Sequence, residues 1–217
     1  MVTQARSVHV SRRQRKMHDK QSRIFAAAAA MFAEHGFEGT TTQQISDRAD
    51  IAAGTLFRYA ASKGELLLMV YNEELRTALE DGAVAARRRT DTVEAVFAMI
   101  RPLLRAAAQQ PENTIVYQRE LLFGSPTDKY RSAGLALVAR LESMIAERLV
   151  ADARRDGIGS ERSEERARVA GRSIFAVLHL ALVQPSTGTR PGHDAMADLR
   201  AQIAQIIAGF FTSPGRQ

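Results

Sequence analysis

Apolar side chains recur every three or four residues along almost the whole chain, and this spacing predicts α-helices. Met196, Leu199, Ile203, Ile206 and Phe210, for example, form one continuous stripe near the C-terminus. Strand-like alternation of polar and apolar residues is missing, as are hairpin signals between alternating runs. The sequence therefore predicts an all-α protein whose helices pack on one another.

Composition and length limit the size of the core and the cellular compartment expected for this protein. The chain has 217 residues, 45% of them hydrophobic, which suffices for one sizeable core or for a small domain beside a larger one. Cysteine is absent, so disulfide bonds and thiolate chemistry are excluded. No apolar run reaches the roughly 18 to 20 residues that cross a bilayer, and the first twenty residues contain no block of signal-peptide type. We expect a cytoplasmic protein with no membrane partner.

The positive charge is concentrated in the N-terminal third. Residues 1–64 contain ten Lys or Arg and five Asp or Glu, which accounts for +5 of the net charge of +6. The other 153 residues contain twenty basic and nineteen acidic side chains. A polyanion should therefore bind near the N-terminus, although a charged tail that only keeps the protein in solution is the alternative.

Several stop signals divide the helical pattern into segments. Gly36 ends the first helix, Pro102 should kink a later one, and Gly124-Ser125-Pro126 ends another. The expected helices span residues 18–35, 65–89, 92–109 and 111–123. A long helix then runs to about Arg155, a helix after the loop 156–163 reaches Val183, and the last helix spans about 193–211.

Three helix starts lie close together in residues 40–67. Thr40 with Gln43, or Thr41 with Gln44, fits a capping box, and Ser62 with Glu65 fits another. A helix ending at Asp50, a tight turn and a second helix through Tyr59 lie between them, which is the shape that inserts a helix end into the major groove of DNA. Such short helices are marginal alone, so a small core must hold them. Its expected members are Ile24, Met31, Phe32, Ile45, Ile51, Leu56 and Leu66.

Several residues between positions 20 and 70 match the sequence pattern of a known protein family. They are the apolar and alanine-rich first helix ending in Phe32 and Gly36-Phe37, Thr40-Thr41, Ile45, Gly54-Thr55-Leu56, Phe57, Tyr59, and Lys63 before Leu66. Together they resemble the DNA-binding domain of the tetracycline-repressor (TetR) family of bacterial transcription regulators. The remaining two thirds of the chain resemble the family only in length and helical layout. The resemblance implies a flexible basic arm (1–17), a helix-turn-helix domain (18–64) and a larger helical-bundle domain for ligand binding and dimerisation (65–217).

The sequence departs from the family pattern at four positions. Ser46 stands where alanine is usual and Asp50 stands where the turn glycine is usual. Aspartate tolerates the left-handed conformation better than most residues, so we expect the turn to be preserved. Phe57 replaces a tyrosine whose hydroxyl could reach phosphate, and Ala60 replaces a phenylalanine and removes core volume.

The resemblance implies that residues 52–59 enter the major groove and that Thr41, Tyr59 and Lys63 touch phosphates. Lys63 also begins a helix, where free N–H groups favour an anion. Ala52, Ala53 and Gly54 offer no side-chain hydrogen bonds, so base contacts must come from neighbouring polar residues or from alanines on thymine methyls. The predicted DNA-contacting set is Thr41, Thr42, Gln43, Gln44, Ala53, Gly54, Thr55, Phe57, Arg58, Tyr59 and Lys63, with Arg48 as a further candidate. Helix capping, packing or simple solvation are the alternatives for individual members.

Four basic residues, Arg12, Arg13, Arg15 and Lys16, precede the first expected helix. We expect them to form an arm that follows phosphates or enters a minor groove, with a solubility tail as the alternative. Deleting residues 1–16 should then weaken DNA binding and flatten its salt dependence.

For the C-terminal part, the resemblance implies a homodimer in which the last two long helices form a four-helix bundle. Two reading heads would then bind a palindromic operator in double-stranded DNA, with half-sites one or more turns of roughly 34–36 Å apart. The expected interface residues are Phe175, Leu178, Leu182, Met196, Leu199, Ile203, Ile206 and Phe210, with intramolecular core as the alternative. The candidate contacts of an unidentified small-molecule inducer are Phe97, Tyr117, Phe123 and His179, each of which could instead belong to the core.

Enzymatic motifs are missing. There is no nucleophile elbow, phosphate-binding loop or HExxH pair, and His9, His18, His35, His179 and His193 are scattered, so we expect neither catalysis nor a cofactor or metal. The sequence thus predicts a ligand-responsive transcriptional regulator, most simply a repressor. The alternatives are a sequence-independent architectural DNA-binding protein and a helical ligand carrier that has lost DNA binding.

Overall fold

The predicted all-α class is confirmed by the computed structural model, which describes residues 12–159, 161–187 and 194–212. These residues form nine α-helices and no strand. No helix among them is apolar over a length that would span a bilayer. The helices are α1 (Arg12–His35), α2 (Thr42–Arg48), α3 (Ala53–Leu56), α4 (Lys63–Ala86), α5 (Thr92–Gln109), α6 (Pro111–Phe123), α7 (Lys129–Arg155), α8 (Ser163–Thr187) and α9 (Ala195–Thr212).

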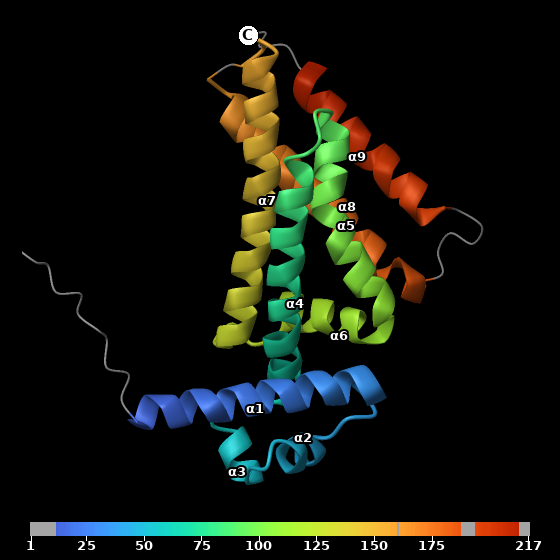
Figure 1. Ribbon diagram of the computed structural model, residues 1–217. Coiled ribbons are helices and arrows are strands. Elements are labelled where there is room, and N and C mark those ends of the chain that lie inside the picture. The colour runs from blue at the N-terminus through green and yellow to red at the C-terminus, as the bar shows by residue number, and fades with distance from the viewer. Residues whose placement is uncertain (1–11, 160, 188–193, 213–217) are drawn as a thin grey trace, which may run out of the picture.

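The first three helices form a head at one end of the molecule. In Figure 1, α1 lies across the lower end of α4, and α2 and α3 lie on the far side of α1. The head has its own apolar core, in which Phe32 stacks on Phe37 with ring centroids 5.9 Å apart. Six of the seven residues expected in this core are buried, and the seventh, Ile51, is half-buried against them. The packing supplies the stability that such short helices lack alone.

The remaining helices form a larger body around a second core. Helix α4 joins the two parts, because the side chains of its first turns belong to the core of the head and those of its later turns to the core of the body. Gly82 allows α5 to approach α4 closely, since a Cβ there would lie 2.2 Å from the carbonyl oxygen of Met99. The buried centre of the body includes Leu79, Val96, Ile100, Leu141, Ile145, Leu149, Ile174, Leu178 and Ile203.

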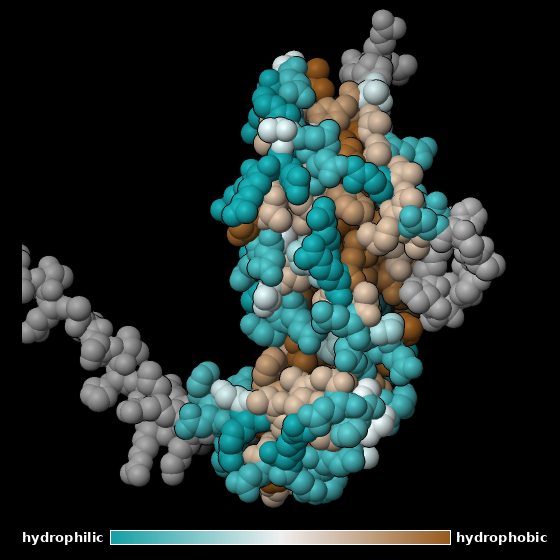
Figure 2. Space-filling model, turned by 45° about the vertical axis from the view of Figure 1, so that its right-hand side comes forward, coloured by the Kyte–Doolittle hydropathy of each residue, from teal (hydrophilic) through white to brown (hydrophobic). Residues whose placement is uncertain are grey.

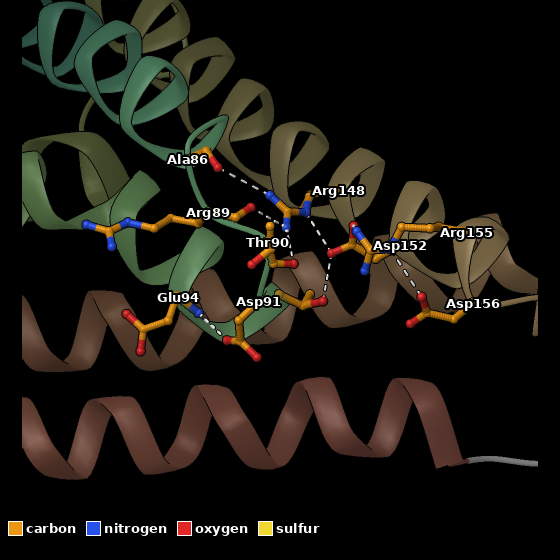
Figure 3. A network of polar contacts seen from close by, with 10 residues as sticks. Ala86, Arg89, Thr90, Asp91, Glu94, Arg148, Asp152, Arg155 and Asp156 are labelled. Carbon is orange, nitrogen blue, oxygen red and sulfur yellow. Dashed lines mark hydrogen bonds and ion pairs between the residues drawn. The ribbon is translucent and has the colours of Figure 1, made fainter.

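A buried polar network fixes the end of the body farthest from the head (Figures 1 and 3). The carboxylate of Asp152, which is 3% exposed, accepts hydrogen bonds from Arg148, from Arg155 and from the hydroxyl of Thr92. Arg148 also donates to the last carbonyls of α4 and of the loop after it. These belong to Ala86 at 3.3 Å, Arg89 at 2.9 Å and Thr90 at 3.1 Å. The arginine therefore satisfies acceptors that a helix C-terminus leaves without partners.

Some predicted boundaries were wrong. The first helix begins at Arg12, not His18, because the charged residues before His18 are good helix formers that extend the alanine-rich segment. Residues 12–17 are therefore helical rather than part of a flexible arm, while residues 1–11 lie outside the described residues. The later helices shift by a few residues at their ends: α4 ends at Ala86, α8 continues to Thr187, and α9 begins at Ala195.

Candidate nucleic-acid interface and ligand cavity

The start of α2 is fixed by a reciprocal cap. The hydroxyl of Thr41 accepts a hydrogen bond from the backbone N–H of Gln44 at 3.2 Å, and the side-chain oxygen of Gln44 accepts one from the backbone N–H of Thr41 at 2.8 Å. Thr40 instead is fully buried, and its hydroxyl donates to the carbonyl of Gly36 at 2.7 Å. Of the two alternatives predicted for this helix start, the capping box formed by Thr41 and Gln44 is confirmed. The amide oxygen of Gln44 thus serves the cap, while Thr42 and Gln43 remain at the accessible edge of α2.

The turn between α2 and α3 is built on Asp50. Its φ of 50° places it in the left-handed region, as predicted for an aspartate at this position. Arg23 of α1 donates to both the carbonyl and the carboxylate of Asp50, at 3.4 Å and 3.2 Å. Sequence reasoning missed Arg23, which connects the turn to the first helix.

Helix α3 presents its outer side to solvent. Leu56 is fully buried and Ala60 is 2% exposed, so these two residues anchor the segment in the core of the head. Gly54 and Arg58 are exposed, and the ring of Phe57 is 49% exposed. The regular helix ends at Leu56 instead of Tyr59, although backbone hydrogen bonds such as Tyr59 N–H to the carbonyl of Leu56 continue the turn. The segment expected to meet DNA is therefore at the surface.

Arg48 is occupied by a neighbour. Its guanidinium donates two hydrogen bonds to the carboxylate of Glu34 on α1, at 2.6 Å and 2.7 Å, and this interaction lowers the pKa of Glu34. A guanidinium paired in this way is aimed at α1, which disfavours Arg48 as a base reader. Arg58 is also exposed, and its side chain has no ion-pair partner among the described residues.

Lys63 has a structural role that the sequence did not reveal. Its ammonium donates to the carbonyls of Phe37 at 2.8 Å and Thr40 at 3.0 Å, and it lies 4.2 Å from the centroid of the Phe37 ring. Lys63 therefore ties the start of α4 to the loop between α1 and α2. Contact of its remaining N–H with a phosphate stays a prediction.

We call α2, the turn at Asp50 and residues 53–60 the reading unit. Tyr59 connects this reading unit to the body. Its side chain is half-buried, and its carbonyl accepts a hydrogen bond of 3.2 Å from the hydroxyl of Tyr130 on α7. The carbonyl of Tyr130 accepts from Asn72 at 2.7 Å, and Asn72 accepts from the hydroxyl of Tyr117 at 2.9 Å. These contacts form a chain of hydrogen bonds from α3 to α6.

Tyr117 at the end of this chain lines a cavity inside the body. The cavity has a volume of about 70 Å³ between α4, α5, α6, α7 and α8, and its walls are mainly apolar. Glu74 and Gln118 are polar exceptions. Burial raises the pKa of Glu74 and of Tyr117, and it raises the pKa of Tyr71 to about 12. The lining residues are Tyr71, Glu74, Leu75, Ala78, Leu103, Ala106, Ala107, Thr114, Tyr117, Gln118, Leu121, Leu137, Val138, Leu141, Phe175, Leu178 and Leu182.

Only one of the four predicted ligand contacts, Tyr117, lines this cavity. Phe97 is buried in the core of the body with the guanidinium of Arg200 over its ring, and Phe123 is 82% exposed at the end of α6. His179 lies against Phe175 outside the cavity, and burial lowers its pKa. These three residues therefore do not line this cavity, because aromatic character does not reveal which side of a helix faces a given space.

Glu74 was missed although the sequence carried a signal for it. Tyr71, Glu74 and Ala78 follow one another at helical spacing, so Glu74 interrupts an otherwise apolar stripe of α4. Oε1 of Gln118 is buried and has no hydrogen-bond partner among the described residues. This feature depends on the tertiary structure and could not be predicted from the sequence.

Most of the predicted dimer residues have other roles. Leu178, Leu199, Ile203 and Phe210 are buried in the core of their own chain, because α9 packs on α5 and α8. Phe175, Leu178 and Leu182 line the cavity, Ile206 is half-buried, and Met196 is 43% exposed. Among the described residues of α8 and α9, the large apolar side chains that reach the surface are Val169, Leu180 and Met196. Figure 2 shows a hydrophobic strip on the body above a largely hydrophilic head.

Comparisons with known proteins agree with this arrangement. Residues 24–70 match the family described as "Bacterial regulatory proteins, tetR family". The transcriptional repressor KstR of Rhodococcus jostii is 28% identical over 134 residues, which cover 62% of this chain and 61% of KstR. The regulator RutR of Escherichia coli is 27% identical over 147 residues, which cover 67% of this chain and 69% of RutR. The match therefore spans less than two thirds of the length of KstR.

The fold has a counterpart among solved structures. FadR of Thermus thermophilus, a TetR-family transcriptional repressor solved in complex with lauroyl-CoA, superposes with a TM-score of 0.70 and 25% identity. The superposition covers 91% of this chain and 98% of FadR. All three proteins are named as transcriptional repressors or regulators. Residues 24–70 therefore match the DNA-binding domain of the TetR family of bacterial regulatory proteins, and the fold of the described residues is similar to that of a TetR-family repressor.

Proposed function

We propose that this protein is a transcriptional repressor that leaves its DNA operator when a small molecule enters the cavity. The observation that carries this proposal is the chain of hydrogen bonds that joins Tyr117 in the cavity wall to Tyr59 at the end of the reading unit. A binding event in the body can thereby alter the position of α3. KstR and FadR, which the chain resembles, are both named repressors.

The DNA-reading part consists of α2, the turn at Asp50 and α3. Gln43 and Arg58 are exposed and Thr42 is half-buried, and each carries a donor for DNA, although one N–H of the Gln43 amide already donates to Asp47 at 2.8 Å. The backbone around Gly54 permits close approach to the duplex. The recognition helix carries few polar side chains, so one head alone discriminates weakly between sequences. A homodimer that binds two half-sites of a palindrome increases the discrimination. We also propose phosphate contacts for the basic residues Arg12, Arg13, Arg15 and Lys16.

The ligand-binding part is the cavity of the body. Its apolar walls suit a ligand with a substantial hydrocarbon portion, and the lauroyl-CoA bound by FadR of T. thermophilus is such a molecule. The ligand must bind more tightly to the conformation whose heads do not fit the operator. Linkage then requires DNA and ligand to weaken each other's binding by the same factor.

Selection of bound fragments from a genomic DNA library tests the proposal. We expect a palindromic consensus and an affinity for it about 10³-fold or more above that for random duplex. Arg58→Ala should weaken binding to the consensus, whereas Arg168→Ala, an exposed arginine on α8, should not. Equal affinity for all duplexes would instead indicate an architectural protein. No affinity for any duplex at low salt would indicate a ligand carrier.

The dimer is tested separately. Val169, Leu180 and Met196 are the exposed apolar residues of α8 and α9, so they are the interface residues that we propose in place of the buried ones. Leu180→Glu should shift the protein from dimer to monomer in sedimentation and should reduce operator affinity. A wild-type protein that sediments as a monomer at micromolar concentration would refute the dimer.

A further inference from the structure

The outward side of α3 is formed mainly by apolar and small residues. Gly54 and Phe57 are three residues apart and so lie on one side of the helix, whereas Leu56 and Ala60 face the core of the head. The ring of Phe57 is 49% exposed, and Ala52 directly before the helix is exposed as well. A Cβ at Gly54 would meet no atom within 4 Å, so this side of α3 is open. Helix α3 lies in the part of the head that points away from the body (Figure 1).

Most long polar side chains of α2 already have partners within the head. Oε1 of Gln44 accepts hydrogen bonds from the backbone N–H and from the hydroxyl of Thr41, at 2.8 Å and 2.9 Å. The amide of Gln43 donates to Asp47 at 2.8 Å. The guanidinium of Arg48 donates twice to a carboxylate of α1. Few donors and acceptors of α2 are therefore left for the edges of bases.

Phe57 is held in place by its own backbone and by its neighbour. Its N–H donates to the carbonyl of Ala53 at 3.3 Å, and Leu56 beside it is fully buried. The exposed ring has no hydroxyl, so its contacts with a partner are apolar, and burying it against an apolar group is favourable. In the major groove of DNA the apolar group is the C5-methyl of thymine, because the other base-edge groups there are hydrogen-bond donors or acceptors.

We propose that the reading unit selects its operator through thymine methyl groups, with the ring of Phe57 as the principal contact and the methyl of Ala52 as a second. The proposal rests on the repressor function above and specifies the chemistry of the half-site, which carries a T·A pair where Phe57 meets the groove. Arg58 is exposed and supplies positive charge to the same surface, but a guanidinium does not distinguish thymine from a base without the methyl group.

Uracil substitution in the selected operator tests the proposal on the full-length protein. Deoxyuridine pairs as thymidine does and lacks only the methyl group, so replacing each thymine in turn maps the methyl groups that the protein contacts. We expect a position in each half-site where the replacement weakens binding about fourfold, and about 15-fold when both half-sites are changed. The ratio of thymine to uracil affinity should not vary with salt, because a methyl contact releases no counter-ion.

Two variants assign the methyl contact to Phe57. Phe57→Ala should lower the thymine-to-uracil ratio at the mapped position to about one, whereas Phe57→Leu keeps an apolar side chain and should keep most of the ratio. Arg58→Ala is the matched control, since it should weaken binding to both operators equally and leave their ratio unchanged. Thermal unfolding should show that all three variants fold, because both side chains are exposed.

A second base substitution separates methyl recognition from hydrogen-bond readout. Exchange of the mapped T·A pair for C·G removes the methyl group and also changes the donors and acceptors in the groove. A 5-methylcytosine at that position restores the methyl group but not the hydrogen-bond pattern. We expect the methylated pair to recover most of the affinity that the C·G pair loses with the wild-type protein, and to recover none with Phe57→Ala.

Three results would overturn the inference. If the protein selects a palindrome but no thymine in it responds to uracil, the reading unit does not use methyl groups, and the repressor function stands. If uracil-sensitive positions exist but Phe57→Ala keeps the wild-type ratio at all of them, Phe57 is not the residue that reads them. If the protein binds every duplex equally, both the proposed function and this inference are wrong.

Discussion

The hydroxyl of Tyr117 donates a hydrogen bond of 2.9 Å to Oδ1 of Asn72 and thereby joins the wall of the cavity to α4, the helix that enters the head. Gly134 of α7 packs directly on this contact, because a Cβ at that position would lie 2.7 Å from Oδ1 of Asn72. The amide of Asn72 continues the connection to Tyr130, and the hydroxyl of Tyr130 continues it to the carbonyl of Tyr59. A ligand that moves Tyr117 would therefore disturb the hydrogen bonds that lead through Asn72 and Tyr130 to Tyr59, which follows α3.

The first prediction concerns this route. Tyr117→Phe removes the donor to the buried Oδ1 of Asn72, so the free energy of unfolding should fall by about 1–3 kcal/mol. The ligand should also lose much of its effect on operator affinity. Urea unfolding measures the first effect, and fluorescence anisotropy of labelled operator with and without ligand measures the second. Tyr130→Phe, which breaks the last link, should reproduce the loss of coupling. An undiminished ligand effect in both variants would show that the signal takes another path.

The second prediction separates the two roles of Lys63. Because its ammonium binds the carbonyls of Phe37 and Thr40, Lys63→Met should lower the free energy of unfolding by about 1.5–3 kcal/mol. Lys129→Met, an exposed lysine in the first turn of α7, serves as the control and should change stability little. If Lys63→Met retains full stability and only reduces the salt dependence of DNA binding, Lys63 is a phosphate contact and not a structural tie.

Local features of the head were predictable because they depend on residues close in the sequence. The cap joins Thr41 and Gln44, which are three positions apart, and the turn depends on the left-handed conformation of Asp50 itself. Contacts between distant segments were not predictable in this way. Asn113 of α6 binds the backbone N–H of Phe37 at 2.7 Å and the carbonyl of Phe32 at 2.9 Å, and nothing in the local sequence connects them.

The C-terminal helices illustrate a second limit. Helical periodicity correctly indicated that Leu199 and Ile203 face an apolar surface. Periodicity does not say whether that surface belongs to the same chain or to a partner. The structure assigns it to the same chain, since α9 covers α5 and α8. The cavity depends on five helices at once, so its lining could not be read from any one stripe.

The third prediction uses the unusual conformation of Asp50. A residue other than glycine with φ near 50° carries a conformational cost, which aspartate partly avoids. Asp50→Ala should therefore lower the free energy of unfolding by about 1 kcal/mol, through backbone strain and loss of the exposed contact with Arg23. Asp50→Gly loses the same contact but gains conformational freedom, so it should be more stable than Asp50→Ala. Thermal unfolding of the two variants provides the comparison, and equal stability would contradict the strain argument.

The fourth prediction concerns the buried network of Figure 3. Asp152→Asn leaves the largely buried guanidinium of Arg148 without its counter-charge, so the free energy of unfolding should fall by about 3 kcal/mol. Glu164→Gln breaks an exposed pair with Arg154 and should cost less than about 0.5 kcal/mol. Operator affinity of folded Asp152→Asn should be unchanged, because the network lies at the end of the body opposite the head. A loss of DNA affinity without a loss of stability would indicate an unforeseen connection between the two ends.

The last prediction follows from the raised pKa of Glu74, whose cause is partial desolvation of its carboxyl group beside the cavity, although the residue as a whole is exposed. A carboxyl group with a higher pKa in the folded than in the unfolded protein binds its proton more tightly in the folded state. Its contribution to stability is therefore greatest at low pH and decreases as the pH rises from the unfolded pKa, about 4.3, through the raised folded pKa. Glu74→Gln cannot ionise, so its stability relative to wild type should increase between pH 4 and pH 7, as measured by urea unfolding at each pH. Subtracting the two proteins cancels the titration of all other groups, and a difference that stays constant over this range would show that Glu74 ionises in the cavity wall as readily as in water.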